Sequence, residues 1–436
     1  MSICIGIRHE DKYVMERRAP LTPKHVDKLV HHQNLDIIVQ SSEKRVFTDE
    51  EYIKAGAKIA KDLKKCSVIF GVKEMPDSFF EEGKTYVFFS HVIKGQPYNM
   101  HMLKRMMDLK CNLIEYEKII DEQGKRLIFF GRYAGLAGMI NSFWALSLRL
   151  KHYGYDSKVL GIKQAHQYHS LEEAREDISS VGQAIVERGI PSELRPFVIG
   201  FTGYGNVSQG AQEICGLLPV KEITPKKLLS LSKRKFLPDN IVYKVIFKEE
   251  DLVEPIDPTH EFDLQDYYTN PFKYKNAFEK YIPHLSMLIN GMYWDEKYPR
   301  IFTKEHLKKI SHKSRPKMIV VGDISCDVEG AVEFMVKPTT IEDPIYVYNP
   351  ETEQITMGYH GEGMQIMAVD ILPSELPRDS SNGFGDVLVN FVKPIAIADY
   401  SLPFEELDLP RAIKKALILH NGKLTPSYKY LADFIV

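Results

Sequence analysis

The chain has 436 residues, a formal net charge of −2 and a hydrophobic content of 44%. This length favours two domains over one. The nearly neutral charge argues against a nucleic-acid partner, because no basic excess is present to neutralise phosphates. No apolar stretch approaches the roughly 18 residues of a membrane span, so no membrane partner is expected.

The cysteines, histidines and amino terminus indicate the compartment. Five cysteines are scattered, mostly in apolar surroundings, which is typical of buried thiols in a reducing compartment. His166 and His169 have no third ligand nearby in the sequence, so no metal site is predicted. The first residues enter a strand at once and resemble neither a secretory signal nor a transit peptide. We therefore expect a cytoplasmic protein, or a mitochondrial-matrix protein if a targeting segment is missing from this chain.

The first 131 residues alternate short apolar runs with helical patterns. This alternation predicts a parallel sheet with helices on its faces. The pattern predicts strands at residues 3–7, 37–39, 67–72, 85–89 and 112–115, and helices at residues 23–32, 49–55 and 96–109.

A long apolar helix is predicted over residues 134–153, where the chain first crosses between domains. Gly135 and Gly138 would allow this helix to pack closely against a neighbour. A second helix, opened by a capping box at Ser170, is predicted to follow as far as Arg188.

Residues 196–218 are the most informative stretch. An apolar run over residues 196–202 predicts a buried strand, and apolar residues at helical spacing from Val207 predict a helix. Gly203 and Gly205 lie between them, as in dinucleotide-binding turns. The first glycine permits a tight turn, the second lets the backbone approach a pyrophosphate, and the helix start at Asn206 offers free N–H groups. Ser208 stands where the motif usually has its third glycine.

The choice between NAD and NADP rests on the next predicted strand, residues 220–224. Thr224 ends it, and Lys226 and Lys227 follow. A hydroxyl beside cations suits the 2′-phosphate of NADP, whereas Glu222 would suit the ribose hydroxyls of NAD. The sequence favours NADP (as NADPH), and NAD stays open.

The rest of the chain continues the α/β pattern. Residues 236–282 are polar and aromatic and are interpreted as an insertion or irregular loop of the nucleotide domain. Further strands are predicted at residues 287–290, 318–322, 345–348 and 355–358, and helices at residues 373–376, 385–392 and 411–418. Pro394 is expected to end the middle helix. The fold predicted is α/β: two Rossmann-like, doubly wound parallel-sheet domains with an interdomain cleft.

Polar side chains follow the ends of several predicted strands, where ligands of such folds bind. They are Arg18, Lys73, His91 and Asp323. Arginine offers a rigid fork for a carboxylate, and a lysine in a desolvated cleft exchanges protons nearer neutrality. Histidine titrates there without help. These groups suit hydride transfer to an amine-bearing carbon, and no nucleophile-elbow or Walker A motif competes.

Several motifs, taken together and in this order, resemble a known family. RAPLTP at residues 18–23, GVKE at 71–74 and SH at 90–91 are similar to the alanine dehydrogenase and transhydrogenase N-terminal fold. Narrower stretches resemble the lysine-ketoglutarate reductase domain, the lysine-forming saccharopine dehydrogenase half of the aminoadipic semialdehyde synthase type. They are FGRYAGLAGMIN at 130–141, FTGYGNVSQGA at 201–211, INGMYW at 289–294, DISCD at 323–327, DILPSELPR at 370–378 and FGD at 384–386.

This resemblance implies a reaction and a domain plan. The reaction is NADPH-dependent, reversible condensation of L-lysine with 2-oxoglutarate to saccharopine, a step of lysine degradation. The plan assigns residues 1–131 to a substrate domain, residues 132–345 to a dinucleotide-binding domain and residues 346–436 to a segment that returns to the first. A homo-oligomer, and a fused or separate glutamate-forming saccharopine dehydrogenase, are expected partners.

The resemblance also assigns roles to residues. Lys73 and His91 match an acid–base pair, and Arg18, Glu117 and Arg132 match substrate-binding positions. The cofactor-binding positions are Gly203, Gly205, Asn206, Val207, Ser208, Thr224, Lys226, Asn290 and Asp323.

Three alternatives stay open. One is an alanine dehydrogenase-like amino-acid dehydrogenase of the same fold, and another is the NAD-dependent lysine-forming saccharopine dehydrogenase. The third is a dinucleotide-sensing regulatory protein without catalysis, which would need Gly203 and Gly205 but neither Lys73 nor His91.

Overall fold

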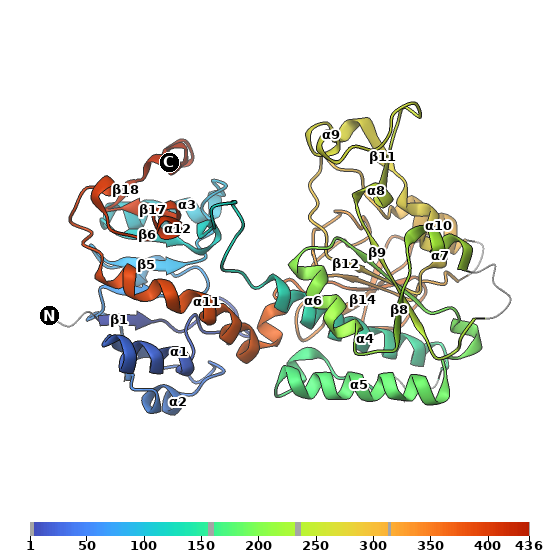
Figure 1. Cartoon of the computed structure of the whole chain (residues 1–436), viewed down its shortest axis with the longest axis horizontal. Helices are drawn as coiled ribbons and strands as arrows, with labels where there is room; N and C mark the ends of the chain where they lie inside the picture. Colours follow the sequence, from blue (N-terminus) through green and yellow to red (C-terminus); the bar gives the residue numbers. More distant parts are fainter. Residues whose placement is uncertain (1–3, 156–160, 232–236, 313–314, 436) are drawn as a thin grey trace. The chain divides into compact units, whose positions relative to one another are not determined.

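The computed structural model describes residues 4–155, 161–231, 237–312 and 315–435. The expected strand start at Ile3 and the start of the expected insertion at residue 236 lie outside these ranges. The chain divides into two compact units, Met1–Phe130 with Pro377–Val436, and Gly131–Leu376 (Figure 1). Within the described residues, no helix combines the length and the apolar character that crossing a membrane requires.

The first unit is built on a sheet with strand order β18-β17-β6-β5-β4-β1-β2-β3. Strands β1 to β6 are parallel, and β17 joins the β6 edge antiparallel. The strands are β1 (Cys4–Ile7), β2 (Asp36–Gln40), β3 (Lys58–Ala60), β4 (Val68–Phe70), β5 (Thr85–Phe88), β6 (Asn112–Glu115), β17 (Leu417–His420) and β18 (Lys423–Leu424). The order reverses between β1 and β4, which makes their carboxyl ends the expected ligand site of this sheet.

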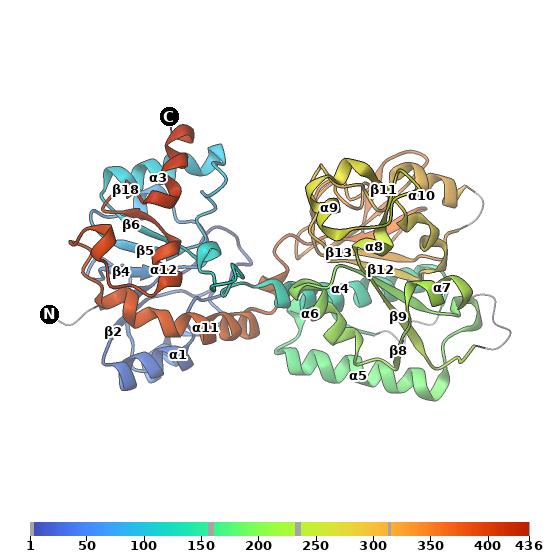
Figure 2. The same ribbon diagram turned by 45° about the horizontal axis from the view of Figure 1, so that its top comes forward.

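Helices cover this sheet and complete one apolar core. They are α1 (Pro23–Asp27), α2 (Asp49–Lys54), α3 (Pro97–Asp108), α11 (Pro377–Ile397) and α12 (Arg411–Ala416). Helix α11 lies beside α1, where Gly385 leaves room for the imidazole of His25 (Figures 1 and 2). Residues of α11 and β17 belong to the same buried cluster as β1, β4 and β5, so the returning segment is part of this unit's core.

The second unit has a sheet with strand order β15-β14-β16-β13-β12-β7-β9-β8. Strands β8, β9, β7, β12, β13 and β16 are parallel, and β14 and β15 extend the edge antiparallel. They are β7 (Val198–Thr202), β8 (Val220–Glu222), β9 (Val242–Phe247), β12 (Met287–Asn290), β13 (Val320–Asp323), β14 (Ile345–Tyr348), β15 (Ile355–Met357) and β16 (Met364–Met367). A separate antiparallel pair is formed by β10 (Val253–Pro255) and β11 (Tyr274–Asn276).

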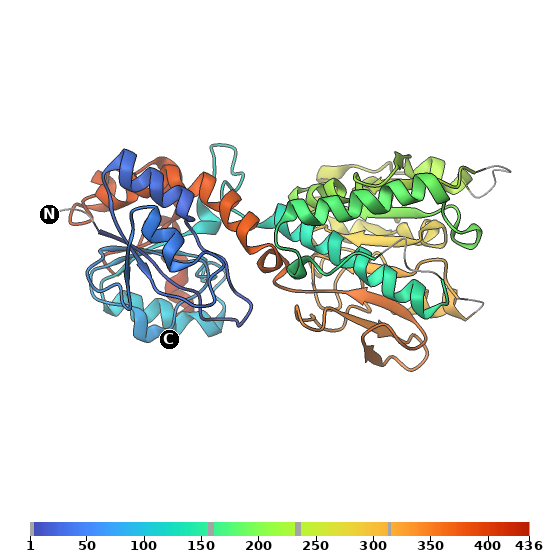
Figure 3. The same cartoon turned by 90° about the horizontal axis from the view of Figure 1, so that it is seen from below.

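Helices pack on both faces of this second sheet. Helices α4 (Gly131–His152), α5 (Leu171–Arg188) and α6 (Asn206–Cys215) lie on one face, which Figure 3 shows from below. Helices α8 (Glu249–Leu252), α9 (Leu264–Thr269) and α10 (Lys304–Ser311) lie on the other (Figure 2), and α7 (Pro225–Leu231) follows β8. The α/β class with two Rossmann-like units is therefore confirmed.

Three differences from the sequence analysis have physical causes. Residues 346–376 belong to the second unit, because β16 pairs with β13 and β14 pairs with β16; the return begins at Pro377. Part of the expected irregular loop is β9, a central strand. Pro394 does not end its helix: α11 continues to Ile397, because burial of Val392 and Ile395 in the core outweighs the missing hydrogen bond.

Two glycines set the contact between α4 and α6. A Cβ at Gly135 would lie 1.9 Å from the carbonyl oxygen of Val207, and one at Gly210 would lie 2.1 Å from that of Arg132. The prediction that Gly135 permits close packing is confirmed. Gly210 thus lets α6 approach the backbone of α4, while Ser208 occupies the position of the third motif glycine.

Replacing Gly135 with alanine should destabilise the second unit by about 3 kcal/mol, because a backbone atom must move to admit the methyl group. Urea unfolding followed by circular dichroism measures this change. Gly161→Ala is the matched control, since a Cβ there meets no atom of the described residues within 4 Å. Equal stability of the two variants would contradict the close packing.

Candidate functional site

The carboxyl ends of β1 and β4 are joined by Glu10. Its Oε1 accepts from the backbone N–H of Val72 (2.7 Å), and its Oε2 accepts from that of Lys73 (2.8 Å). Burial, followed by repulsion from Glu16, raises the pKa of the Glu10 carboxyl to about 7. The carboxylate thus fixes the loop that carries Lys73, at the point where the strand order reverses.

Lys73 is a half-buried residue of the first unit. Burial is the largest cause that lowers its pKa, and the Arg18 guanidinium adds to it, while Glu16 and Glu74 oppose the change. Its Nζ lies 6.0 Å from the ring centroid of Tyr13. A lysine with a lowered pKa is the better proton-exchanging group near neutral pH.

His91 and Lys73 have a common neighbour, Glu74. The Nδ1 atom of His91 is 2.7 Å from Glu74 Oε1, and Lys12 Nζ is 2.8 Å from the same oxygen. Burial alone would raise the pKa of Glu74, but the hydrogen bonds from His91 and Lys12 lower it to about 2. Because this carboxylate stays ionised, Nδ1–H donates to it, which fixes the orientation of the His91 ring.

Glu115, at the end of β6, orders the backbone around His91. Its Oε2 accepts from the N–H groups of Ser90 (2.7 Å) and His91 (3.1 Å), and its Oε1 accepts from the N–H of Glu117 (3.1 Å). The residue is fully buried, and burial raises its pKa. His91 holds a left-handed backbone conformation, with φ of +50°, which these bonds help to maintain.

The remaining substrate candidates are already paired. Arg18 is buried and donates to Glu16 from Nε (2.8 Å) and Nη2 (2.5 Å), with its guanidinium carbon 4.2 Å from the Phe130 ring centroid. Glu117 pairs with Arg126 at 2.8 Å. Arg132 belongs to the second unit, where it pairs with Glu213 at 2.7 Å. Within the first unit, Glu117 is linked to His91 through the carboxylate of Glu115, and Lys73 is linked electrostatically to Arg18 and Glu16.

The second unit carries a row of polar side chains across three strand ends. The register of β7, β12 and β13 places Thr202, Asn290 and Asp323 at the same level. Thr202 Oγ1 donates to Asn290 Oδ1 (2.7 Å), and Asn290 Nδ2 donates to Asp323 Oδ1 (2.9 Å). Burial raises the pKa of Asp323 to about 7, and its buried Oδ2 has no hydrogen-bond partner among the described residues.

The glycine turn follows β7, directly beside this row. Gly203 has φ of +82° and lies against Gly291 and Met292, so the turn requires glycine there. A Cβ at Gly205 would meet no atom within 4 Å. Asn206 then begins α6 with its N–H groups exposed at the turn. These unpaired backbone N–H groups, with the Asp323 oxygen that has no hydrogen-bond partner among the described residues, suit the pyrophosphate and a polar end group of a dinucleotide.

Thr224 and Lys226 lie apart from this turn. They follow the edge strand β8, and β9 separates β8 from β7. Thr224 Oγ1 accepts from the N–H of Lys227, in the first turn of α7. Strand β9 and the residues after it were not predicted, although the apolar run of Val242–Phe247 is a strand signal.

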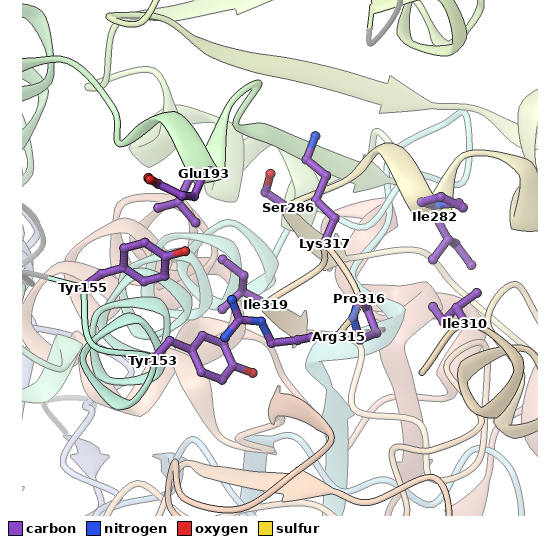
Figure 4. Close-up of a pocket in the computed structure, with 12 residues that line it drawn as sticks. Tyr153, Tyr155, Glu193, Ile282, Ser286, Ile310, Arg315, Pro316, Lys317 and Ile319 are labelled. Carbon is purple, nitrogen blue, oxygen red and sulfur yellow. The ribbon is translucent and has the colours of Figure 1, made fainter. Parts of the chain in front are cut away.

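A cavity of about 410 Å³ lies at the opposite end of the second sheet (Figure 4). Ser286 and Ile319, which line it, come just before β12 and β13, so it opens at the amino ends of the strands. Tyr153, Arg315 and Lys317 also line it. It is distinct from the glycine turn, because parallel strands carry the turn and the polar row at their carboxyl ends.

Solved structures define the class of fold. An L-alanine dehydrogenase is similar over 100% of both chains, with a TM-score of 0.61 and 15% sequence identity. A transhydrogenase from Sinorhizobium meliloti is similar over 97% of this chain and 99% of that chain, with a TM-score of 0.55 and 16% identity. The fold is the two-unit, Rossmann-like α/β fold of these proteins.

Family models then show to which family the chain belongs. The model "Alanine dehydrogenase/PNT, N-terminal domain" matches residues 6–137, and "Alanine dehydrogenase/PNT, C-terminal domain" matches residues 260–427. Together the matches cover more than half of the sequence. The chain belongs to the alanine dehydrogenase/PNT family, a family of oxidoreductases.

Individual curated relatives are similar to most of this chain. The alpha-aminoadipic semialdehyde synthase of Arabidopsis thaliana is 37% identical over 98% of this chain and 41% of its own length. The mitochondrial synthase of Mus musculus is 33% identical over 98% of this chain and 47% of its own length. The chain therefore spans less than half of these relatives. A saccharopine dehydrogenase [NAD(+), L-lysine-forming] of Emericella nidulans is 24% identical over 88% of this chain and 90% of its own length.

Asp323→Asn should change how stability depends on pH. The folded protein holds a proton on Asp323 up to a pKa of about 7, whereas the unfolded chain releases it near 3.8. Wild-type protein therefore loses stability as pH rises from about 4 to 7, and the asparagine variant avoids that loss, by up to about 4 kcal/mol.

Urea unfolding of both proteins between pH 4.5 and 8 measures the difference. The exposed Asp295→Asn variant controls for the loss of one charge. Parallel stability curves for wild type and Asp323→Asn would contradict the raised pKa.

Proposed function

We propose that this chain catalyses the reductive condensation of L-lysine with 2-oxoglutarate to saccharopine, as an NAD(P)-dependent oxidoreductase acting on CH–NH bonds in lysine degradation. The overall change joins the side-chain amine of lysine to the keto carbon, releases one water, and consumes one hydride and one proton. The observation that carries the proposal is the Lys73–Glu74–His91 cluster within a chain similar along 98% of its length to aminoadipic semialdehyde synthases.

Lys73 and His91 are the proposed proton-transfer groups. The amine of lysine must lose a proton before it attacks the keto carbon, and the carbonyl oxygen must gain protons before it leaves as water. Lys73, whose pKa burial lowers from that of a free lysine, is the better placed of the two to accept and return a proton. His91 is proposed to share this role through Nε2, while Glu74 holds the ring through Nδ1.

Charge at the first unit also suits these substrates. Both substrates carry carboxylates, and the Arg18, Lys12 and Lys73 side chains gather at the carboxyl ends of β1 and β4. Arg18 is held rigid by Glu16 and Phe130, so it would bind a carboxylate with little loss of side-chain entropy. Glu117, and Arg132 of the second unit, are retained as proposed substrate-binding residues.

The second unit is proposed to bind the dinucleotide. Gly203, Gly205 and the N–H groups of Asn206, Val207 and Ser208 would hold the pyrophosphate, and Asn290 and Asp323 would face the nicotinamide. When bound, NADPH or NADH supplies the hydride. From the sequence, Thr224 and Lys226 favour NADPH. The strand order instead favours the residues that follow β9 as those that select the cofactor, and therefore a different choice of cofactor.

A spectrophotometric assay tests the function. The full chain is mixed with L-lysine and 2-oxoglutarate, and oxidation of NADPH and of NADH is followed in parallel. Omission of either substrate should abolish the signal. Pyruvate with ammonia tests for an alanine dehydrogenase activity, and turnover with that pair alone would overturn the proposal.

Lys73→Met should lower the turnover rate about 10²- to 10⁴-fold, the usual contribution of general acid–base catalysis. Dinucleotide affinity should stay unchanged, because Lys73 lies in the other unit from the glycine turn. Lys104→Met, on the exposed face of α3, is the matched control. Wild-type turnover in Lys73→Met would remove Lys73 from the mechanism.

A further inference from the structure

The strand beside β7 is not the next strand in the sequence. Strand β9 pairs with β7 over Val198–Thr202, with Thr202 opposite Phe247, and β8 lies beyond β9 at the sheet edge. Strands are about 4.8 Å apart, so the end of β8 is about 10 Å from the end of β7. In Rossmann folds an acidic residue at the end of the strand beside the glycine turn accepts from the adenosine ribose. By position, that strand is β9.

Glu249 follows β9 and begins α8. The phenol of Tyr204, between the two glycines of the turn, donates to its carboxylate at 3.1 Å. The phenol of Tyr268, from α9, donates to the same carboxylate at 2.7 Å. The carboxylate is therefore oriented by two hydroxyls, one of which belongs to the dinucleotide turn itself. Glu249 is only partly buried, so a ligand can reach it.

The residues at the end of β8 have other contacts. Glu222 pairs with Lys244 at 2.7 Å, and Thr224 caps α7. Among the described residues, Glu222, Thr224 and Lys226 make no hydrogen bond or ion pair to the glycine turn. A ribose held at that turn would thus meet the end of β9 first.

We propose that Glu249 recognises the adenosine ribose and makes this chain prefer NADH to NADPH. Its carboxylate accepts hydrogen bonds from the ribose hydroxyls, and its negative charge repels a 2′-phosphate. Tyr204 and Tyr268 orient the carboxylate. The inference rests on the proposed dinucleotide binding of the second unit, and it replaces Thr224 and Lys226 as the residues that select the cofactor.

Two charged residues next to Glu249 are relevant to the choice between NADH and NADPH. Lys248 precedes Glu249 and is exposed, and its backbone N–H donates to Asp251 at 3.0 Å. A 2′-phosphate would be attracted to Lys248, so this lysine is the rival determinant. Glu250 is also exposed, one residue further along α8, and it provides a matched charge control.

Direct binding of NADH and NADPH tests the proposal without turnover. Dissociation constants are measured by dinucleotide fluorescence on the full chain for wild type and Glu249→Gln. Wild type should bind NADH more tightly. Glu249→Gln should shift the NADH-to-NADPH affinity ratio toward NADPH by about tenfold or more, the size expected for losing a hydrogen bond to a charged group. Glu250→Gln should leave the ratio unchanged.

Further variants separate the outcomes. Glu249→Asp keeps the charge and should keep the preference for NADH, and circular dichroism checks that each variant is folded. A ratio that responds to Thr224→Ala, Lys226→Gln or Lys248→Gln but not to Glu249→Gln would overturn the inference while leaving the proposed function intact. Failure of wild type to bind either dinucleotide would overturn both.

Discussion

The buried carboxylate of Glu10 connects the two halves of the first sheet. It receives the N–H groups of Val72 and Lys73, which leave β4, while it follows β1 itself. Strand order reverses between these two paired strands, so the segments that follow them lead away from each other. The Glu10 side chain ties these two segments together and gives Lys73 a defined backbone position. The neighbouring bonds of Glu74 and Glu115 then define the ring and backbone of His91.

In the second unit, the pairing of parallel strands fixes the positions of the candidate site residues. The register of three strands places Thr202, Asn290 and Asp323 in line, and their side chains hydrogen-bond in sequence. The glycine turn leaves the sheet one residue beyond Thr202. A ligand with a pyrophosphate would therefore meet a row of donors and acceptors already ordered by the sheet, which limits the entropy lost on binding.

The sequence predicted what local patterns encode. The apolar run before Gly203, the glycine turn and the packing of Gly135 follow from short-range rules, and the structure contains them. Strand order is a long-range property, so the place of β9 between β7 and β8 was not predicted, and Thr224 was selected as a cofactor-binding residue from its position in the sequence alone. Pro394 shows the same limit, because tertiary packing of α11 overrides a local helix breaker. The pairing of Arg18 with Glu16 likewise depends on side-chain geometry that spacing does not reveal.

The antiparallel strand β17 has a consequence for biosynthesis. It covers the outer edge of β6, and it is made only after the whole of the second unit has left the ribosome. Until then, β6 presents unpaired backbone groups of the kind that recruit foreign strands. The first-unit strands made before the second unit thus keep an open sheet edge while the second unit is synthesised, and chaperone protection would be needed most during that interval.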